Sequence, residues 1–274
     1  MKATKKVLIY ALLACFVLTV AMCILRTVFT LGYYDITLRE YDMEAKGVLT
    51  AFWILLIILV LCICALGIVF RKTDEIEYEY EQKHFFGISN LICGGAFVLA
   101  DILALTKIGE IFSSERKSDA IYRAMTVACV FLAVPCAVYF LITASKSKRD
   151  SKARAYISMF MPLFGIALLC ASYFDGDYTY ADPNRKLANL AMIAALWLIL
   201  TETKANTGAP HKIWRFVASL LAFSLSAIYL VPTLIALMSG IMEATGIIFI
   251  EFFEIGIVFL SLAYSINYIN ATNK

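Results

Sequence analysis

Long runs of hydrophobic residues, separated by short polar segments, follow one another along the whole chain. Runs of 18 or more apolar residues are typical of transmembrane helices, which need about 20 residues to cross the hydrocarbon core. The pattern predicts an all-α fold, a polytopic transmembrane helix bundle that forms one integral membrane domain over residues 1–274, with no sizeable soluble domain. The expected spans are about eight, covering residues 7–30, 48–70, 85–107, 121–144, 155–174, 183–203, 213–238 and 241–267.

The sixth span carries the weakest hydrophobic signal, because its uncharged stretch covers only residues 187–201. Asp182 as N-cap and Pro183 as the first helical residue nevertheless form a good start signal for a helix. Arg185 and Lys186 are expected to extend their charged ends to the membrane interface. With these residues included, the helix is long enough to cross.

Composition supports the membrane interpretation. Hydrophobic residues make up 62% of the chain and charged residues 16%, whereas soluble domains are about 45–50% apolar and about 25% charged. The eight cysteines all lie inside apolar runs, which argues against a disulfide framework, and none forms a Cys-x-x-Cys pair. The sequence contains no P-loop, H-E-x-x-H or G-x-S-x-G motif. We therefore expect a protein that is not an enzyme and that uses no cofactor, metal ion or nucleic acid.

The distribution of basic residues predicts the topology. With the N-terminus placed inside, the inner segments hold 15 of the 24 Lys and Arg residues, most densely in residues 145–154. Cytoplasmic loops carry this excess in membrane proteins. We expect an integral protein of the bacterial cytoplasmic membrane with both termini in the cytoplasm and the lipid bilayer around its spans. The inner loop 71–86, with its mixed charges and aromatic residues, is a possible contact for a membrane protein partner.

Two carboxylates interrupt the last apolar run. Glu251 and Glu254 share one face of the expected helix with Ser261 and Ser265, because the helical repeat places these four residues within about 80°. A charged residue at the centre of a span costs about 2.5–3.5 kcal/mol on insertion scales. Such a polar stripe should face protein or water and not lipid. Since Glu251 and Glu254 are one turn apart, we expect them to share a proton near neutral pH.

Other spans also contain polar residues that apolar packing does not require. Asp101 and Asn90 share a face of the third span, Arg26 lies in the first and Tyr229 in the seventh. Ionisable residues within the membrane mark functional sites by default. The candidate site for a small solute or a proton consists of Glu251, Glu254, Asp101, Arg26, Tyr229 and Asn90.

Two functions remain open at this point. The first is a transporter or permease-like protein for a small solute, which uses the intramembrane carboxylates for binding or proton coupling. Pro135, Pro162 and Pro232 would allow the helix breaks that transporters use. The second is a non-transporting membrane subunit, such as a sensor, an assembly partner or an immunity-type protein. In that case Arg26 would pair with a carboxylate, and the buried charges would be structural.

The topology can be tested by cysteine labelling in a background that lacks the native cysteines. A membrane-impermeant reagent added outside should label single cysteines placed at Glu115 or Asp177, because these positions fall in outer loops. It should not label cysteines placed at Lys148 or Thr207. Labelling of the Lys148 position in intact cells would invert or refute the assignment.

Overall fold

A computed structural model describes residues 5–35, 40–70, 84–113, 120–145, 152–175, 182–208, 212–242 and 248–271. It confirms the all-α bundle, in which eight helical segments are long and apolar enough to span a membrane. The α-helices are α1 (Lys5–Tyr33), α2 (Lys46–Val69), α3 (His84–Ser113), α4 (Ala120–Ala144), α5 (Lys152–Ser158), α6 (Phe160–Phe174), α7 (Pro183–Asn206), α8 (Lys212–Met238) and α9 (Ile248–Ala271). A short 3₁₀ helix, η1 (Met43–Ala45), and a small hairpin of β1 (Tyr34–Asp35) and β2 (Glu40–Tyr41) lie between α1 and α2.

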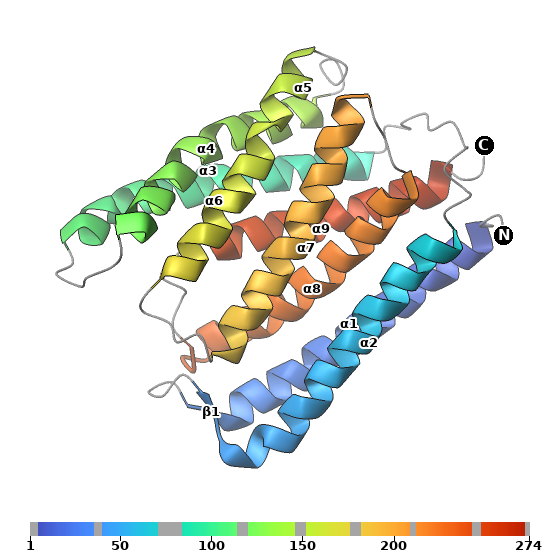
Figure 1. The fold of residues 1–274 in the computed structure, drawn as a ribbon, viewed down its shortest axis with the longest axis vertical. Helices are drawn as coiled ribbons and strands as arrows, with labels where there is room; N and C mark the ends of the chain where they lie inside the picture. The colour runs from blue at the N-terminus through green and yellow to red at the C-terminus, as the bar shows by residue number, and fades with distance from the viewer. Residues whose placement is uncertain are drawn as a thin grey trace.

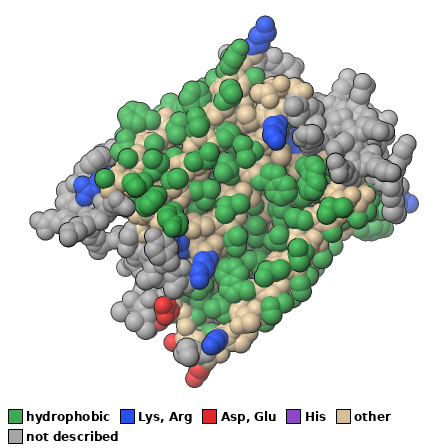
Figure 2. Space-filling model, viewed as in Figure 1, with side chains coloured by type: hydrophobic (Ala, Val, Ile, Leu, Met, Phe, Trp, Pro, Cys, Tyr) green, Lys and Arg blue, Asp and Glu red, His purple; other side chains and the backbone are tan. Residues whose placement is uncertain are grey.

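Successive spans alternate in direction, so both termini lie at the same end of the bundle (Figure 1). We call this the termini end and the opposite end, which carries the hairpin, the far end. Helix α8 occupies the centre and is the most buried span. It packs against α1, α7 and α9, while α3 packs against α9 and α4, and α4 packs against α6. Hydrophobic side chains cover the middle of the face in Figure 2, as expected for a lipid-facing surface.

The start of α7 follows the sequence prediction, because Asp182 is the N-cap and Pro183 is the first helical residue. The Asp182 side chain accepts a hydrogen bond from the Asn184 amide at 2.8 Å. Lys186 is exposed, but the expectation for Arg185 was wrong. Its guanidinium is buried and donates to the carbonyl groups of Ser172 and Tyr173. These carbonyls belong to the last turn of α6 and have no intrahelical donor, so Arg185 caps that helix.

The boundary between the last two spans differs from the prediction. Helix α8 ends at Met238 in a Schellman motif, in which Gly240 has φ +70° and the Ile241 amide donates to the Ala236 carbonyl at 3.0 Å. Residues 239–242 form a turn and bend, and α9 begins at Ile248 instead of residue 241. The glycine allows a left-handed residue, which stops the helix. Glu251 therefore lies in the first turn of α9 and not near its centre.

Prolines shape three helices in different ways. Pro162 separates α5 from α6 at Met159, although the two helices together form one span. Pro135 and Pro232 lie inside continuous helices. Each proline lacks an N–H group and so leaves the carbonyl four residues earlier without its helical partner. For Pro162 this is the Ser158 carbonyl, which accepts a hydrogen bond from the Thr203 hydroxyl at 3.1 Å.

Helices α3 and α9 approach closely at Gly256. A β-carbon at this position would lie 2.6 Å from the Cys93 sulfur and 3.2 Å from the Cys93 α-carbon. Phe97 contacts Phe253, and Phe86 contacts Tyr264, with ring centroids 6.0 and 5.2 Å apart. These pairs establish an antiparallel register between the two helices.

The close approach can be tested with Gly256→Ala. We expect this change to lower stability by about 1–3 kcal/mol, because an inserted methyl group in a packed interior forces neighbouring atoms apart. The control is Gly95→Ala in α3, where no atom lies within 4 Å of an added β-carbon. Thermal unfolding of the purified protein in detergent measures both. Equal midpoints for Gly256→Ala and the unchanged protein would contradict the close packing.

Candidate functional site

Buried polar side chains occur at three levels along the bundle. One group surrounds Arg26 near the far end, one carboxyl group lies at Glu254 near the middle, and a third group surrounds Glu202 at the termini end. The side chains of these three residues are 1%, 0% and 2% exposed. Because burial of a charged or polar group is costly, the partners of each residue decide its role.

The Arg26 cluster consists of Arg26, Thr30, Tyr41, Asn184 and Thr233. The guanidinium donates to Asn184 Oδ1 at 2.9 Å, to Thr233 Oγ1 at 3.0 Å, to the Ile228 carbonyl at 2.6 Å and to the Tyr229 carbonyl. Tyr41 donates to the same Asn184 oxygen at 3.1 Å, and its hydroxyl also bonds Thr30 at 3.0 Å. The hairpin between α1 and α2 thus holds Tyr41 over the cluster. Burial raises the pKa of the Tyr41 phenol, so the neutral hydroxyl donates this bond.

Pro232 explains why Arg26 finds a backbone acceptor in α8. Since Pro232 has no N–H group, the Ile228 carbonyl lacks its helical hydrogen bond and is free to accept one from α1. The expected structural pairing of Arg26 with a carboxylate is not found, because its hydrogen bonds in the described part of the chain all go to uncharged oxygen atoms. Arg26 therefore ties α1 to α8 and α7. Tyr229 contributes its carbonyl and its ring, whose centre lies 5.7 Å from the guanidinium carbon.

Glu254 lies between α9 and α8. Ser226, which is at the middle of the α8 span, interacts with its carboxyl group. However, neither carboxyl oxygen has a partner with hydrogen-bond geometry among the described residues. The charged neighbour of this carboxyl group is Glu251, one turn earlier in α9. Glu254 is thus a buried acid close to the middle of the membrane, beside another acid and without a described basic partner.

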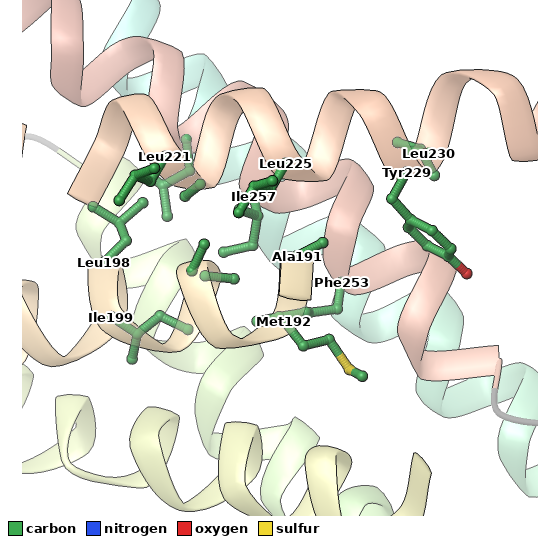
Figure 3. Close-up of a cluster of buried hydrophobic side chains, with 14 of the residues drawn as sticks. Ala191, Met192, Leu198, Ile199, Leu221, Leu225, Tyr229, Leu230, Phe253 and Ile257 are labelled. Atoms are coloured by element: carbon green, nitrogen blue, oxygen red, sulfur yellow. The ribbon is translucent and has the colours of Figure 1, made fainter. Parts of the chain in front are cut away.

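The surroundings of Glu254 combine an apolar cluster with a seam of hydroxyl groups. Figure 3 shows its neighbours in α9 within the apolar cluster, with Ile257 beside Leu225 of α8 and Phe253 beside Met192 of α7. The predicted polar stripe faces α8: Ser261 and Ser265 are fully buried, and Ser265 bonds Ser219 of α8 at 2.7 Å. The stripe therefore faces protein and not lipid.

The structure does not bring the other two candidate residues to Glu254. The Asn90 amide group donates to the Phe86 carbonyl of its own helix at 2.7 Å. The antiparallel register places Asp101 level with the first turn of α9, which contains Glu251. However, Asp101 follows Gly94 by seven residues and shares its face, and Gly94 faces Leu141 of α4. Asp101 is partly exposed at that flank.

The Glu202 cluster was missed by the sequence analysis. The Glu202 carboxylate accepts hydrogen bonds from Arg154 at 3.0 Å, from the Tyr139 hydroxyl at 2.9 Å and from Arg215. Asn206 donates to the Tyr139 hydroxyl at 2.9 Å, and Arg215 stacks on Tyr264 at 4.2 Å. These contacts join α4, α5, α7, α8 and α9 at the termini end. The sequence does place Glu202, Arg154 and Arg215 at the ends of expected spans. Which of these residues pair with one another, however, depends on how the helices pack.

Comparison with known proteins gives no assignment: no protein-family model matches the sequence, and neither a curated protein nor a solved structure shows significant similarity to it. The geometry of the buried polar groups therefore carries the functional argument.

The Glu202 cluster predicts a stability effect. Glu202→Gln keeps the shape but leaves two partly buried guanidinium groups without their carboxylate, so we expect a loss of up to about 3–5 kcal/mol. Adding Arg154→Gln should restore part of this loss, because the pair is then removed together. Thermal unfolding in detergent measures the single and double variants, with Glu44→Gln at an exposed site as control. Strictly additive losses would show that the charges do not interact.

Proposed function

We propose that this protein is a transporter or permease-like protein for a small solute, not an enzyme, and that it binds and releases a proton at Glu254. The observation that carries the proposal is the fully buried carboxyl group that has no hydrogen-bond partner among the described residues. A structural carboxylate is held by donors, as Glu202 is. A carboxyl group left unsatisfied inside the bundle, next to Ser226 at the middle of α8, is stable as the neutral acid and becomes costly when it ionises.

The position of Glu254 supports proton coupling. It lies between the Arg26 cluster towards the far end and the Glu202 cluster at the termini end, and both of those clusters are extensively hydrogen-bonded. A buried acid between two hydrogen-bonded polar clusters suits a group that exchanges its proton only when the bundle opens. Conformational change of this kind is the usual means by which transporters expose a midplane site to one side at a time.

The orientation is part of the proposal. The excess of Lys and Arg in the segments at the termini end supports cytoplasmic termini in a bacterial cytoplasmic membrane. In that orientation the Glu202 cluster is the cytoplasmic layer and the Arg26 cluster the outer layer.

A non-transporting subunit is the second candidate, and Asp101 is the observation that favours it. This residue is partly exposed on α3, where Leu99, Ile102 and Leu103 are exposed towards lipid. Ionisable residues in spans almost always face protein or water. A partner subunit would cover Asp101, and Glu254 would then have no role in solute movement.

Infrared spectroscopy of the carboxyl group tests the proton site directly. Protein labelled with ¹³C-glutamate and reconstituted in liposomes should show a protonated glutamic-acid band at neutral pH. We expect this band to shift in D₂O, to disappear at alkaline pH and to be absent from Glu254→Gln. The matched control Glu44→Gln should retain it. A band that is absent from the unchanged protein, or that does not exchange in D₂O, would contradict a working proton site.

Transport is measured separately on solid-supported membranes. Amino acids, sugars and organic cations are applied under a pH gradient, and currents seen with the unchanged protein should vanish in Glu254→Gln without a loss of thermal stability. A current that survives Glu254→Gln would remove Glu254 from the mechanism. Currents absent for every solute, together with a loss of self-assembly or complex formation in Asp101→Leu, would favour the subunit.

A further inference from the structure

A pocket of about 250 Å³ lies on the side of the bundle between α7 and α8, at the termini end. Its walls are Trp197, Thr201 and Lys204 of α7 and Trp214 of α8. The two indole rings lie 6.1 Å apart between centroids and are tilted by 36°. The Trp214 side of the pocket packs closely on Gly67 of α2, where an added β-carbon would lie 2.8 Å from the indole ring.

The lining changes from apolar to cationic along the membrane normal. Trp197, Thr201 and Lys204 follow one another at intervals of four and three residues, which places them on one face of α7. The rise of about 1.5 Å per residue separates Trp197 from Lys204 by roughly 10 Å. Lys204 lies in the last turn of α7, nearest to the aqueous phase, and Trp197 lies deeper.

The ammonium group of Lys204 has no carboxylate partner among the described residues. Its side chain is exposed, and the nearby acid Glu202 is directed into the bundle, where Arg154 and Arg215 hold it. Trp214 lies in the first turn of α8, so the positive end of that helix dipole is next to the pocket. Among the described residues, the mouth of the pocket therefore carries the positive charge of Lys204, while the wall below it is aromatic.

We infer that this pocket binds an anionic phospholipid, with its phosphate group at Lys204 and its glycerol and upper acyl region against Trp197 and Trp214. Positive charge at the membrane surface attracts anionic headgroups, and basic pockets between spans on the cytoplasmic side hold them. Indole rings favour the zone directly below the headgroup. The order of the three lining residues along α7 matches the order of these chemical groups in a lipid. The inference does not depend on the proposed transport activity.

Quenching of tryptophan fluorescence by brominated lipids tests the inference. Trp53→Phe removes the indole of α2 and leaves Trp197 and Trp214 as the reporters. The protein is reconstituted in phosphatidylcholine vesicles that contain either dibrominated phosphatidylglycerol or dibrominated phosphatidylcholine at equal mole fraction. We expect stronger quenching by the anionic lipid. Lys204→Gln should lower its relative affinity about fivefold, since one Lys near an anionic surface contributes about 1 kcal/mol.

Two controls separate the inference from its alternatives. Lys186→Gln removes an exposed lysine at the opposite end of the same helix and should leave the preference unchanged. Inorganic phosphate at millimolar concentration should not displace the brominated lipid. Equal quenching by the two lipids, an equal effect of Lys186→Gln, or displacement by free phosphate would each overturn the inference. The absence of quenching by either lipid would show that another occupant, such as a partner helix, covers the pocket.

Discussion

In hydrocarbon, a polar backbone group that the helix cannot satisfy must find a partner within the protein. Pro232 leaves the Ile228 carbonyl in this position at the centre of the bundle, and Arg26 of α1 satisfies it. Much of the far half depends on this interaction, because the same guanidinium also reaches Asn184 at the start of α7 and the Tyr229 carbonyl. The Ser158 carbonyl, which Pro162 leaves unsatisfied, is bonded by Thr203 in the same manner. Pro232 and Pro162 thus specify contacts between helices.

The buried charges have different roles because their partners differ. The charge of Arg26 is stabilised by hydrogen bonds to several neutral oxygen atoms. The charge of Glu202 is balanced by two guanidinium groups, and a tyrosine hydroxyl donates a further hydrogen bond. Both residues hold helices together, and removing either would leave costly unsatisfied groups. Glu254 has an apolar environment, a weakly placed serine and a second acid nearby. The Glu202 carboxylate accepts hydrogen bonds from three side chains, whereas neither Glu254 oxygen has a hydrogen-bond partner among the described residues, and this contrast distinguishes a structural charge from a candidate functional one.

The sequence predicted which polar residues of the candidate site share a helix face, but not which residues of other helices they contact. Helical periodicity correctly grouped Ser261, Ser265 and Glu254 on one face, since a regular helix fixes which side chains share a side. Periodicity carries no information on which neighbour that face meets. It therefore could not tell that Asp101 is partly exposed on α3 or that Arg26 bonds carbonyl groups instead of a carboxylate. The Glu202 cluster was missed for the same reason, because its members lie far apart in the sequence.

The sequence alone determined the eight apolar spans found in the described part of the chain, where α7 begins, and which polar residues lie within the spans. Apolar length, an Asp-Pro cap and residue identity are local properties. Tertiary structure decided the rest. It showed that α8 stops at a glycine in a left-handed conformation and that α9 starts later than the apolar run predicts. It also decided which buried charges are satisfied, since the cost of a charge in the membrane depends on the atoms that other helices bring to it.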